Sequence, residues 1–299
     1  MRLLIFWIIV IILGMILWIF HPFLDAYTNL IIWTLLLQGS LALSYDILGG
    51  YGGELHLGHG AFFGLGAYIS MLALIAGIPW GLALVCSAIG GYIFSLVLSR
   101  LLVPLTGGTF ALTSLVVLLF IKSLFRNTGQ ITGGTAGLSA PHLGTTGLWF
   151  SCTLLLFLIC LWVHDSLEDS RFGRALKAVS DDPLAAETTG ISRKKIRTQS
   201  LILGSIMASL AGGIFPFQSG YINLHSAFGI DVAIGPVVMV LLGGPGTRFG
   251  PLIGTVIYVG LQEWLWTHIS EGNLAILGAG LIMIGAFFPS GIVGLIKSR

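Results

Sequence analysis

Long apolar stretches, separated by short polar or glycine-rich segments, occupy almost the whole chain. A helix needs about 20 residues to cross a hydrocarbon layer of about 30 Å, and inside lipid a helix satisfies its own backbone hydrogen bonds. The pattern therefore predicts an all-α integral membrane protein with about ten transmembrane helices. These helices are expected at Leu3–Phe20, Tyr27–Ile47, Ala61–Ile78, Leu82–Leu102, Phe110–Leu124, Leu148–Val163, Ser200–Gln218, Asp231–Leu242, Pro251–Trp266 and Leu274–Val293.

The positions of lysine and arginine predict how these helices are oriented, because cytoplasmic loops are enriched in both residues. Ten crossings that start from a cytoplasmic N-terminus put every basic residue on the cytoplasmic side except Lys122 and Arg126. Both termini are therefore expected in the cytoplasm. Eight crossings with two re-entrant segments fit the charges nearly as well, so the helix count stays between eight and ten.

Composition supports a protein surrounded by lipid. Hydrophobic residues make up 56% of the chain and charged residues 9%, whereas soluble domains carry about 25% charged residues. The net charge of +2 is small, and the basic residues lie at membrane edges, so no nucleic-acid partner is expected. We expect a single transmembrane domain over residues 1–299, multi-pass in the cell's inner membrane.

One polar loop, residues 165–198, interrupts this pattern with seven of the 14 basic and six of the 12 acidic residues of the chain. An apolar stripe at i, i+3, i+4 and i+7 predicts a short amphipathic helix; it consists of Phe172, Ala175, Leu176 and Val179. A second short helix is expected from Asp182 as N-cap, Pro183 at the first helical position and Gly190 as a left-handed end.

Two interpretations of this loop remain open on spacing alone. The helices can lie on anionic headgroups, which attract basic residues. Alternatively, they project into the cytoplasm and fit a groove in a partner protein. The interspersed acidic residues favour a protein partner.

Four segments resemble the permease subunits of ABC importers of the branched-chain amino acid (LivM-like) family. They are the loop sequence FGRALKA at 172–178 with DPLAAETTGI at 182–191, GYGGELHLGHGAFFGLGAY at 50–68, ITGGTAGL at 131–138 and VMVLLGGPGTRFGP at 238–251. The chain departs from the family pattern at Leu184, where Glu is usual, at Glu54 and His56, where Gln and Ser are frequent, and at Thr109, where Tyr is common.

This resemblance implies a non-catalytic permease that moves a small polar solute, branched-chain or related amino acids, by alternating access. The implied partners are two ATPase subunits that hold ATP–Mg, a second related (LivH-like) permease or a copy of this chain, and an extracytoplasmic substrate-binding protein. No cofactor is expected on this chain. The implied ATPase-coupling residues are Arg171, Phe172, Gly173, Arg174, Leu176, Asp182, Pro183, Leu184, Ala185, Ala186, Glu187 and Gly190.

Other functions stay as alternatives at this stage. A urea, short-amide or sugar permease fits the same resemblance. A stand-alone secondary transporter or channel would use intramembrane carboxylates instead, because an ionisable group in a span costs about 2.5–3.5 kcal/mol and usually faces a polar path. Candidates for lining a translocation path are Glu54, His56, Thr113, Lys122, Asn127 and Asp231.

The His56-x-x-His59 pair with Glu54 permits a metal site or an intramembrane enzyme, but the spacing is common and HExxH is absent. The sequence favours a structural role, in which glycines at Gly49–Gly66 allow close packing and the two histidines bond carbonyls freed there. No metal ligand set is therefore predicted. A weak internal echo pairs Leu48–Gly52 with Leu242–Gly246.

Overall fold

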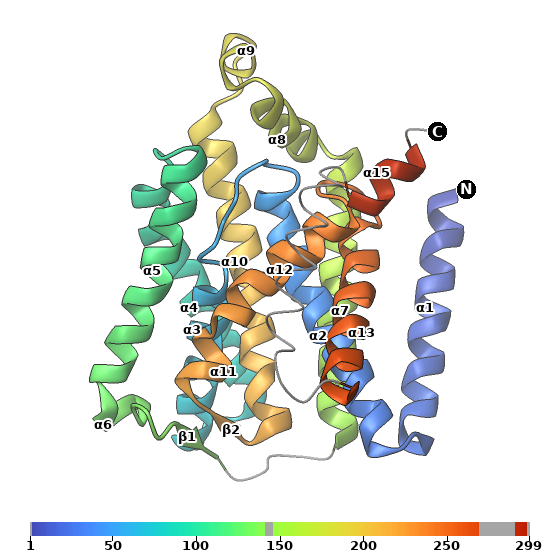
Figure 1. The fold of residues 1–299 in the computed structure, drawn as a ribbon, viewed down its shortest axis with the longest axis vertical. Coiled ribbons are helices and arrows are strands. Elements are labelled where there is room, and N and C mark those ends of the chain that lie inside the picture. Colours follow the sequence, from blue (N-terminus) through green and yellow to red (C-terminus); the bar gives the residue numbers. More distant parts are fainter. Residues whose placement is uncertain (1, 141–145, 269–290, 298–299) are drawn as a thin grey trace.

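The computed structural model describes residues 2–140, 146–268 and 291–297, and these form a mostly helical bundle (Figure 1). The first half contains α1 (Arg2–Phe20), η1 (His21–Phe23), α2 (Ala26–Gly49), α3 (Gly60–Ile75), α4 (Trp80–Leu102), α5 (Gly107–Asn127), α6 (Gly129–Thr132) and β1 (Leu138–Ser139). The second half contains α7 (Thr146–Asp169), α8 (Arg171–Asp181), α9 (Pro183–Thr188), α10 (Arg193–Ser219), β2 (Tyr221–Ile222), α11 (Leu224–Phe228), α12 (Ile230–Gly243), α13 (Gly250–His268) and α15 (Gly291–Lys297).

Six helical segments within the described residues are long and apolar enough to cross a membrane, and shorter apolar helices accompany them. The six are α2, α4, α5, α7, α10 and the segment Leu224–Gly243. Nine of the ten stretches predicted from the sequence coincide with helices, while Leu274–Val293 lies mostly outside the described residues. The chain is therefore a multi-pass membrane protein.

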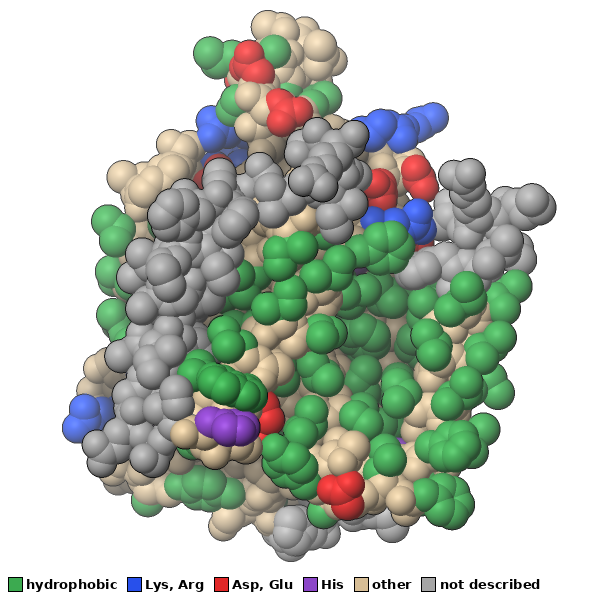
Figure 2. Space-filling model, turned by 45° about the vertical axis from the view of Figure 1, so that its right-hand side comes forward, with side chains coloured by type: hydrophobic (Ala, Val, Ile, Leu, Met, Phe, Trp, Pro, Cys, Tyr) green, Lys and Arg blue, Asp and Glu red, His purple; other side chains and the backbone are tan. Residues whose placement is uncertain are grey.

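One end of the bundle carries most of the charge. Helices α8 and α9 project from this end, and the described ends of α1 and α15 lie on the same side (Figure 1). Figure 2 shows Lys, Arg, Asp and Glu side chains gathered mainly there, with hydrophobic side chains over most of the flank below. At the opposite end β1 and β2 form a short antiparallel pair, Leu138 with Ile222 and Ser139 with Tyr221, a small departure from the expected all-α fold.

Helices α3 and α10 pack at very close range in the centre of the bundle. A Cβ atom at Gly66 would collide with the backbone of Ser209, and one at Gly212 would collide with the Phe63 carbonyl. Ser209 Oγ donates to the carbonyl of Phe62 at 3.0 Å. Small residues at such crossings let backbones approach and replace the hydrophobic drive that lipid does not supply. The close packing predicted for the glycine-rich segment is thus confirmed at Gly66.

The helical structure is interrupted at two places inside the bundle. Residues 50–59, which we call the connecting segment, lead from the end of α2 down to the start of α3 without forming a helix (Figure 1). The second interruption, at Gly229, separates α11 from α12. A Cβ atom at Gly60 would lie 3.0 Å from Ala233 Cα, so α3 and α12 begin side by side. Irregular backbone at this depth is tolerated only where protein covers it.

Candidate functional site

Helix α9 has the capping residues that the sequence predicted for the second helix. Asp182 accepts hydrogen bonds from the N–H groups of Leu184 and Ala185, each at 3.0 Å. Pro183 occupies the first turn, and Gly190 has a φ of 85°, the left-handed region that glycine adopts freely. Ser170 caps α8 by accepting from Gly173 N–H at 2.9 Å. Local chemistry therefore sets the sharp turn between the two helices.

The apolar stripe of α8 is covered by the chain's own bundle. Leu176 is fully buried, and a Cβ atom on Gly52 of the connecting segment would lie 3.3 Å from its Cδ1. Lys177 Nζ lies 4.7 Å from the ring centroid of Tyr51. For Leu176 and Val179 the cover is therefore this chain itself, and neither headgroups nor a partner groove is needed there. Periodicity identified the buried face but could not name its partner.

Helix α9 instead presents its side chains to the outside. Leu184 is 77% exposed, Ala185 and Glu187 are exposed, and only Ala186 faces inward. The predicted coupling residues on α8 include both buried and exposed side chains. Gly173 is buried, Phe172 is half-buried, and Arg171 and Arg174 are exposed. Helix α9 projects beyond the apolar spans (Figure 1), so its exposed leucine is accessible to another macromolecule.

A buried polar cluster lies at the same end of the bundle. His164 Nε2 and Asp46 Oδ2 are 2.7 Å apart with both side chains fully buried. The other Asp46 oxygen accepts the N–H of Gly246 at 3.0 Å. Asp165 accepts from Trp7 Nε1 at 2.9 Å and pairs with Arg248. These contacts tie α1, α2, α7 and the α12–α13 turn together.

The sequence did not predict this cluster, although one signal for it was present. The two halves of the internal echo meet here, because Gly246 approaches Gly50 closely and also binds Asp46. His164 and Asp165 lie at the edge of the polar loop in the sequence. A polar residue there can simply face the membrane interface, so the sequence did not indicate a buried partner for either one.

Glu54 forms an ion pair with Arg197, whose Nη2 lies 2.9 Å from Glu54 Oε1. Arg197 Nη1 also donates to the carbonyl of Val103 at 2.6 Å. Burial raises the pKa of Glu54, while Arg197 acts in the opposite direction and only partly offsets it. The pair thus connects the connecting segment to α10 and to the end of α4.

The two histidines of the connecting segment are buried and do not bond freed carbonyls as expected. His59 Nε2 lies 2.8 Å from the hydroxyl of Ser44, and the His56 ring lies between Phe62 and Phe110 at centroid distances of 5.9 and 5.6 Å. The neighbouring helix α2 supplies the Ser44 hydroxyl as the partner of His59, so this ring bonds a side chain and not a backbone carbonyl. Within the described residues, no three His, Cys, Asp or Glu side chains gather as a metal site.

The remaining path candidates are scattered. Thr113 and Lys122 are half-buried along α5, while Asn127 and Asp231 are exposed. No contact joins Lys122, Asn127 or Asp231 to Glu54 or His56 among the described hydrogen bonds and ion pairs, whereas Ser114, next to Thr113, accepts from the N–H groups of Leu57 and Gly58 beside His56.

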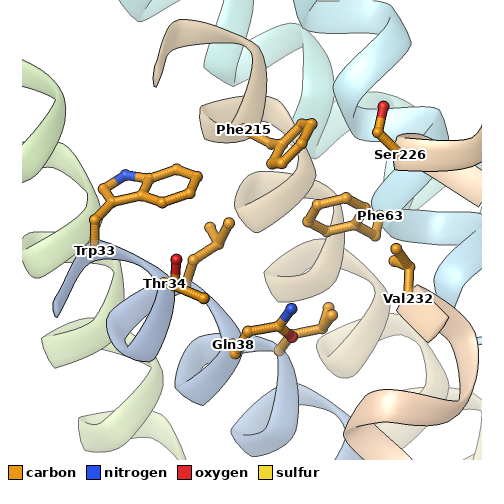
Figure 3. A pocket seen from close by; sticks show the side chains of 9 residues that line it. Trp33, Thr34, Gln38, Phe63, Phe215, Ser226 and Val232 are labelled. Carbon is orange, nitrogen blue, oxygen red and sulfur yellow. The ribbon is translucent and has the colours of Figure 1, made fainter. Parts of the chain in front are cut away.

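A cavity of about 130 Å³ lies in the middle of the bundle instead. None of the six path candidates lines it. Its walls come from α2, α3, α10, α11 and α12 (Figure 3), and they are formed by Trp33, Thr34, Leu37, Gln38, Leu41, Phe63, Phe215, Ser226 and Val232. Gln38 was the available signal, as a polar side chain in the middle of an otherwise apolar run.

Comparison with known proteins shows what the chain is similar to. It is 24% identical over 291 residues to the high-affinity branched-chain amino acid transport system permease protein LivM of Escherichia coli (strain K12), an alignment that covers 87% of this chain and 68% of that protein. It is 25% identical to LivH of the same organism over 281 residues, or 85% of this chain and 90% of that one. A probable LivH of Methanocaldococcus jannaschii is 31% identical over 162 residues, 52% of this chain and 49% of the relative.

A family model described as "Branched-chain amino acid transport system / permease component" matches residues 26–287. The match includes α8, α9, the cavity and every residue of the polar cluster except Trp7. The chain therefore belongs to the permease components of branched-chain amino acid ABC transport systems, which are non-catalytic transmembrane subunits.

Proposed function

We propose that this chain imports branched-chain amino acids across the inner membrane by alternating access, driven by two partner ATPases that hold ATP–Mg. A second related, LivH-like permease or another copy of this chain completes the pathway, and an extracytoplasmic binding protein delivers the solute. Family membership supports the solute class and the complex. In this account α9 is the contact with the ATPase.

The observation that carries the proposal is the contrast within the hairpin. Leu184 on α9 is 77% exposed, whereas Leu176 on α8 is fully buried against this chain. A partner that binds α9 gains an apolar anchor without disturbing the permease core. Because α8 is packed on the connecting segment, a displacement of α9 moves α8 and that segment together, as packed elements move as bodies.

The membrane orientation belongs to the same proposal. Ten crossings put the α8–α9 end in the cytoplasm, together with both termini. Two observations support this: the described ends of α1 and α15 lie on the side of α8 and α9 (Figure 1), and the loop that forms the hairpin holds seven of the 14 basic residues.

The test is site-specific cross-linking. Cys86, Cys152 and Cys160 are replaced, a single cysteine is introduced at Ala185, and the complex is probed with and without ATP. We expect an adduct with the ATPase whose yield depends on nucleotide. The matched control carries its cysteine at Thr128, an exposed residue after α5, and should give none. A folded Ala185→Cys permease that forms no adduct with any ATPase contradicts the proposal.

Uptake of radiolabelled solutes tests the finer claim about the cargo. Proteoliposomes that contain the complete transporter should accumulate L-leucine, L-isoleucine or L-valine only with ATP inside the compartment that holds the ATPases. Uptake of urea, a short amide or a sugar in their place would identify one of the alternative solute classes. Uptake by this chain alone, driven by a proton gradient, would identify a secondary transporter.

A further inference from the structure

The cavity in the middle of the bundle has mainly apolar walls. Trp33, Leu37 and Leu41 from α2, Phe63 from α3 and Phe215 from α10 supply most of them. In Figure 3 the rings of Trp33, Phe63 and Phe215 surround the space on separate sides. No charged side chain belongs to the lining. A charged group placed against these apolar walls, away from Gln38 and the start of α12, would lose its hydration without gaining a partner.

One polar atom of a side chain that lines this space is buried without a hydrogen-bond partner. It is the Oε1 of Gln38. Figure 3 shows the Gln38 amide reaching toward the space from α2. Buried polar groups nearly always have partners, so an unpartnered acceptor on a side chain of the cavity wall indicates a guest that supplies a donor.

Two helices begin at the cavity wall. Phe63 is the fourth residue of α3, and Val232 is the third residue of α12. In α3 the N–H groups of Ala61 and Phe62 already bond the carbonyls of Gly58 and His59. The start of α12 has no side-chain cap, and its free N–H groups and partial positive charge favour a carboxylate. Discontinuous helices in transporters use their starts in this way near the middle of the membrane.

We propose that this cavity is the solute's transit site, with the aliphatic side chain of a branched-chain amino acid against the aromatic wall. The amide of Gln38 binds the polar end of the amino acid, whose carboxylate points toward the start of α12. This inference rests on the proposed function and assigns residues to it.

The size of the cavity supports this solute class. A cavity of about 150 Å³ in another protein binds benzene, so about 130 Å³ accommodates a three- or four-carbon side chain. An indole side chain is too large, and a lysine or glutamate side chain would place its charge among apolar walls. The cavity therefore selects small aliphatic side chains from within the amino acids that the delivery protein presents.

The experiment measures selectivity in the complete transporter, purified through a tag on this chain and reconstituted with saturating binding protein. Val232→Leu adds one methylene to the cavity wall and should lower the L-leucine to L-valine uptake ratio about tenfold. Val256→Leu is the matched control, because Val256 on α13 is 61% exposed. Gln38→Leu should lower uptake of both solutes about tenfold, whereas Gln262→Leu on α13 should leave it unchanged.

A second measurement reports occupancy without transport. In the cysteine-free background, Thr34→Cys places a thiol in the cavity lining, and N-ethylmaleimide labels it. L-Leucine should slow this labelling several-fold, and L-lysine should not. This readout decides the matter for any variant whose complex does not assemble.

The outcomes separate the two proposals. If the wild-type transporter takes up no branched-chain amino acid, the proposed cargo is wrong. If it does take them up, but Val232→Leu and Gln38→Leu match their controls and L-leucine gives no protection at position 34, the cavity is not the transit site and this inference is overturned.

Discussion

Two leucines in one polar loop have opposite environments. Leu176 on α8 is fully buried against the chain's own connecting segment, while Leu184 on α9 is 77% exposed. Both occur in the sequence that resembles an ATPase-coupling loop, and hydropathy alone gives them the same weight. The difference teaches that α8 belongs to the body of the permease, whereas α9 is free to contact another protein. Under the proposed function, α9 would receive the ATPase's motion and α8 would pass it to the bundle.

The largest effect is expected below the hairpin, in the polar cluster that supports it. Asp46→Ala removes the partner of His164 and the acceptor of Gly246 N–H. Breaking a buried pair from one side costs about 3–5 kcal/mol, so the apparent melting temperature of the purified chain should fall steeply. Asp169→Ala, at an exposed carboxylate, is the matched control and should change stability by less than about 0.5 kcal/mol. Equal melting temperatures would show that the cluster does not support the fold.

The next largest expected effect is the difference in stability between variants at Leu176 and Leu184. Leu176→Ala leaves a void under α8 and should cost about 2–5 kcal/mol of folding free energy. Leu184→Ala removes a side chain that is 77% exposed, so its melting temperature should stay close to wild type. Thermal unfolding of both variants in the same detergent is the measurement. If the two variants lose equal stability, the division between α8 and α9 is wrong.

The smallest expected effect is on assembly. Leu184→Ala should weaken ATPase binding about tenfold, equivalent to about 1.4 kcal/mol, because it deletes the exposed anchor of α9. Titration of the purified ATPase onto the immobilised permease gives the dissociation constant. The control is Leu112→Ala on α5, where Leu112 is 64% exposed; this variant should bind the ATPase as wild type does. An unchanged affinity for Leu184→Ala would remove α9 from the interface.

Sequence reasoning predicted the parts of this fold that depend on local chemistry. Apolar stretches located the helices, and the cap residues Asp182 and Gly190 located the α8–α9 turn, because each signal acts within a few residues. The family resemblance reached the right class for the same reason, since its motifs are short and contiguous.

The cavity and the buried cluster could not be predicted in this way. A helix in lipid is apolar on the face toward lipid and on the face toward the bundle, so periodicity does not say which side chains point inward. Gln38 and Trp33 gave no sign that Phe215, far along the chain, would lie across from them. The contact between Asp46 and His164 likewise spans 118 residues.

The most direct test of the central claim is hydrogen–deuterium exchange on the permease with and without its ATPase. Amides of α9 should exchange quickly in the free permease and become protected when the ATPase binds, while amides of α8 should be slow in both states. Fast exchange in α8 without the ATPase, or no protection of α9 with it, would contradict the account.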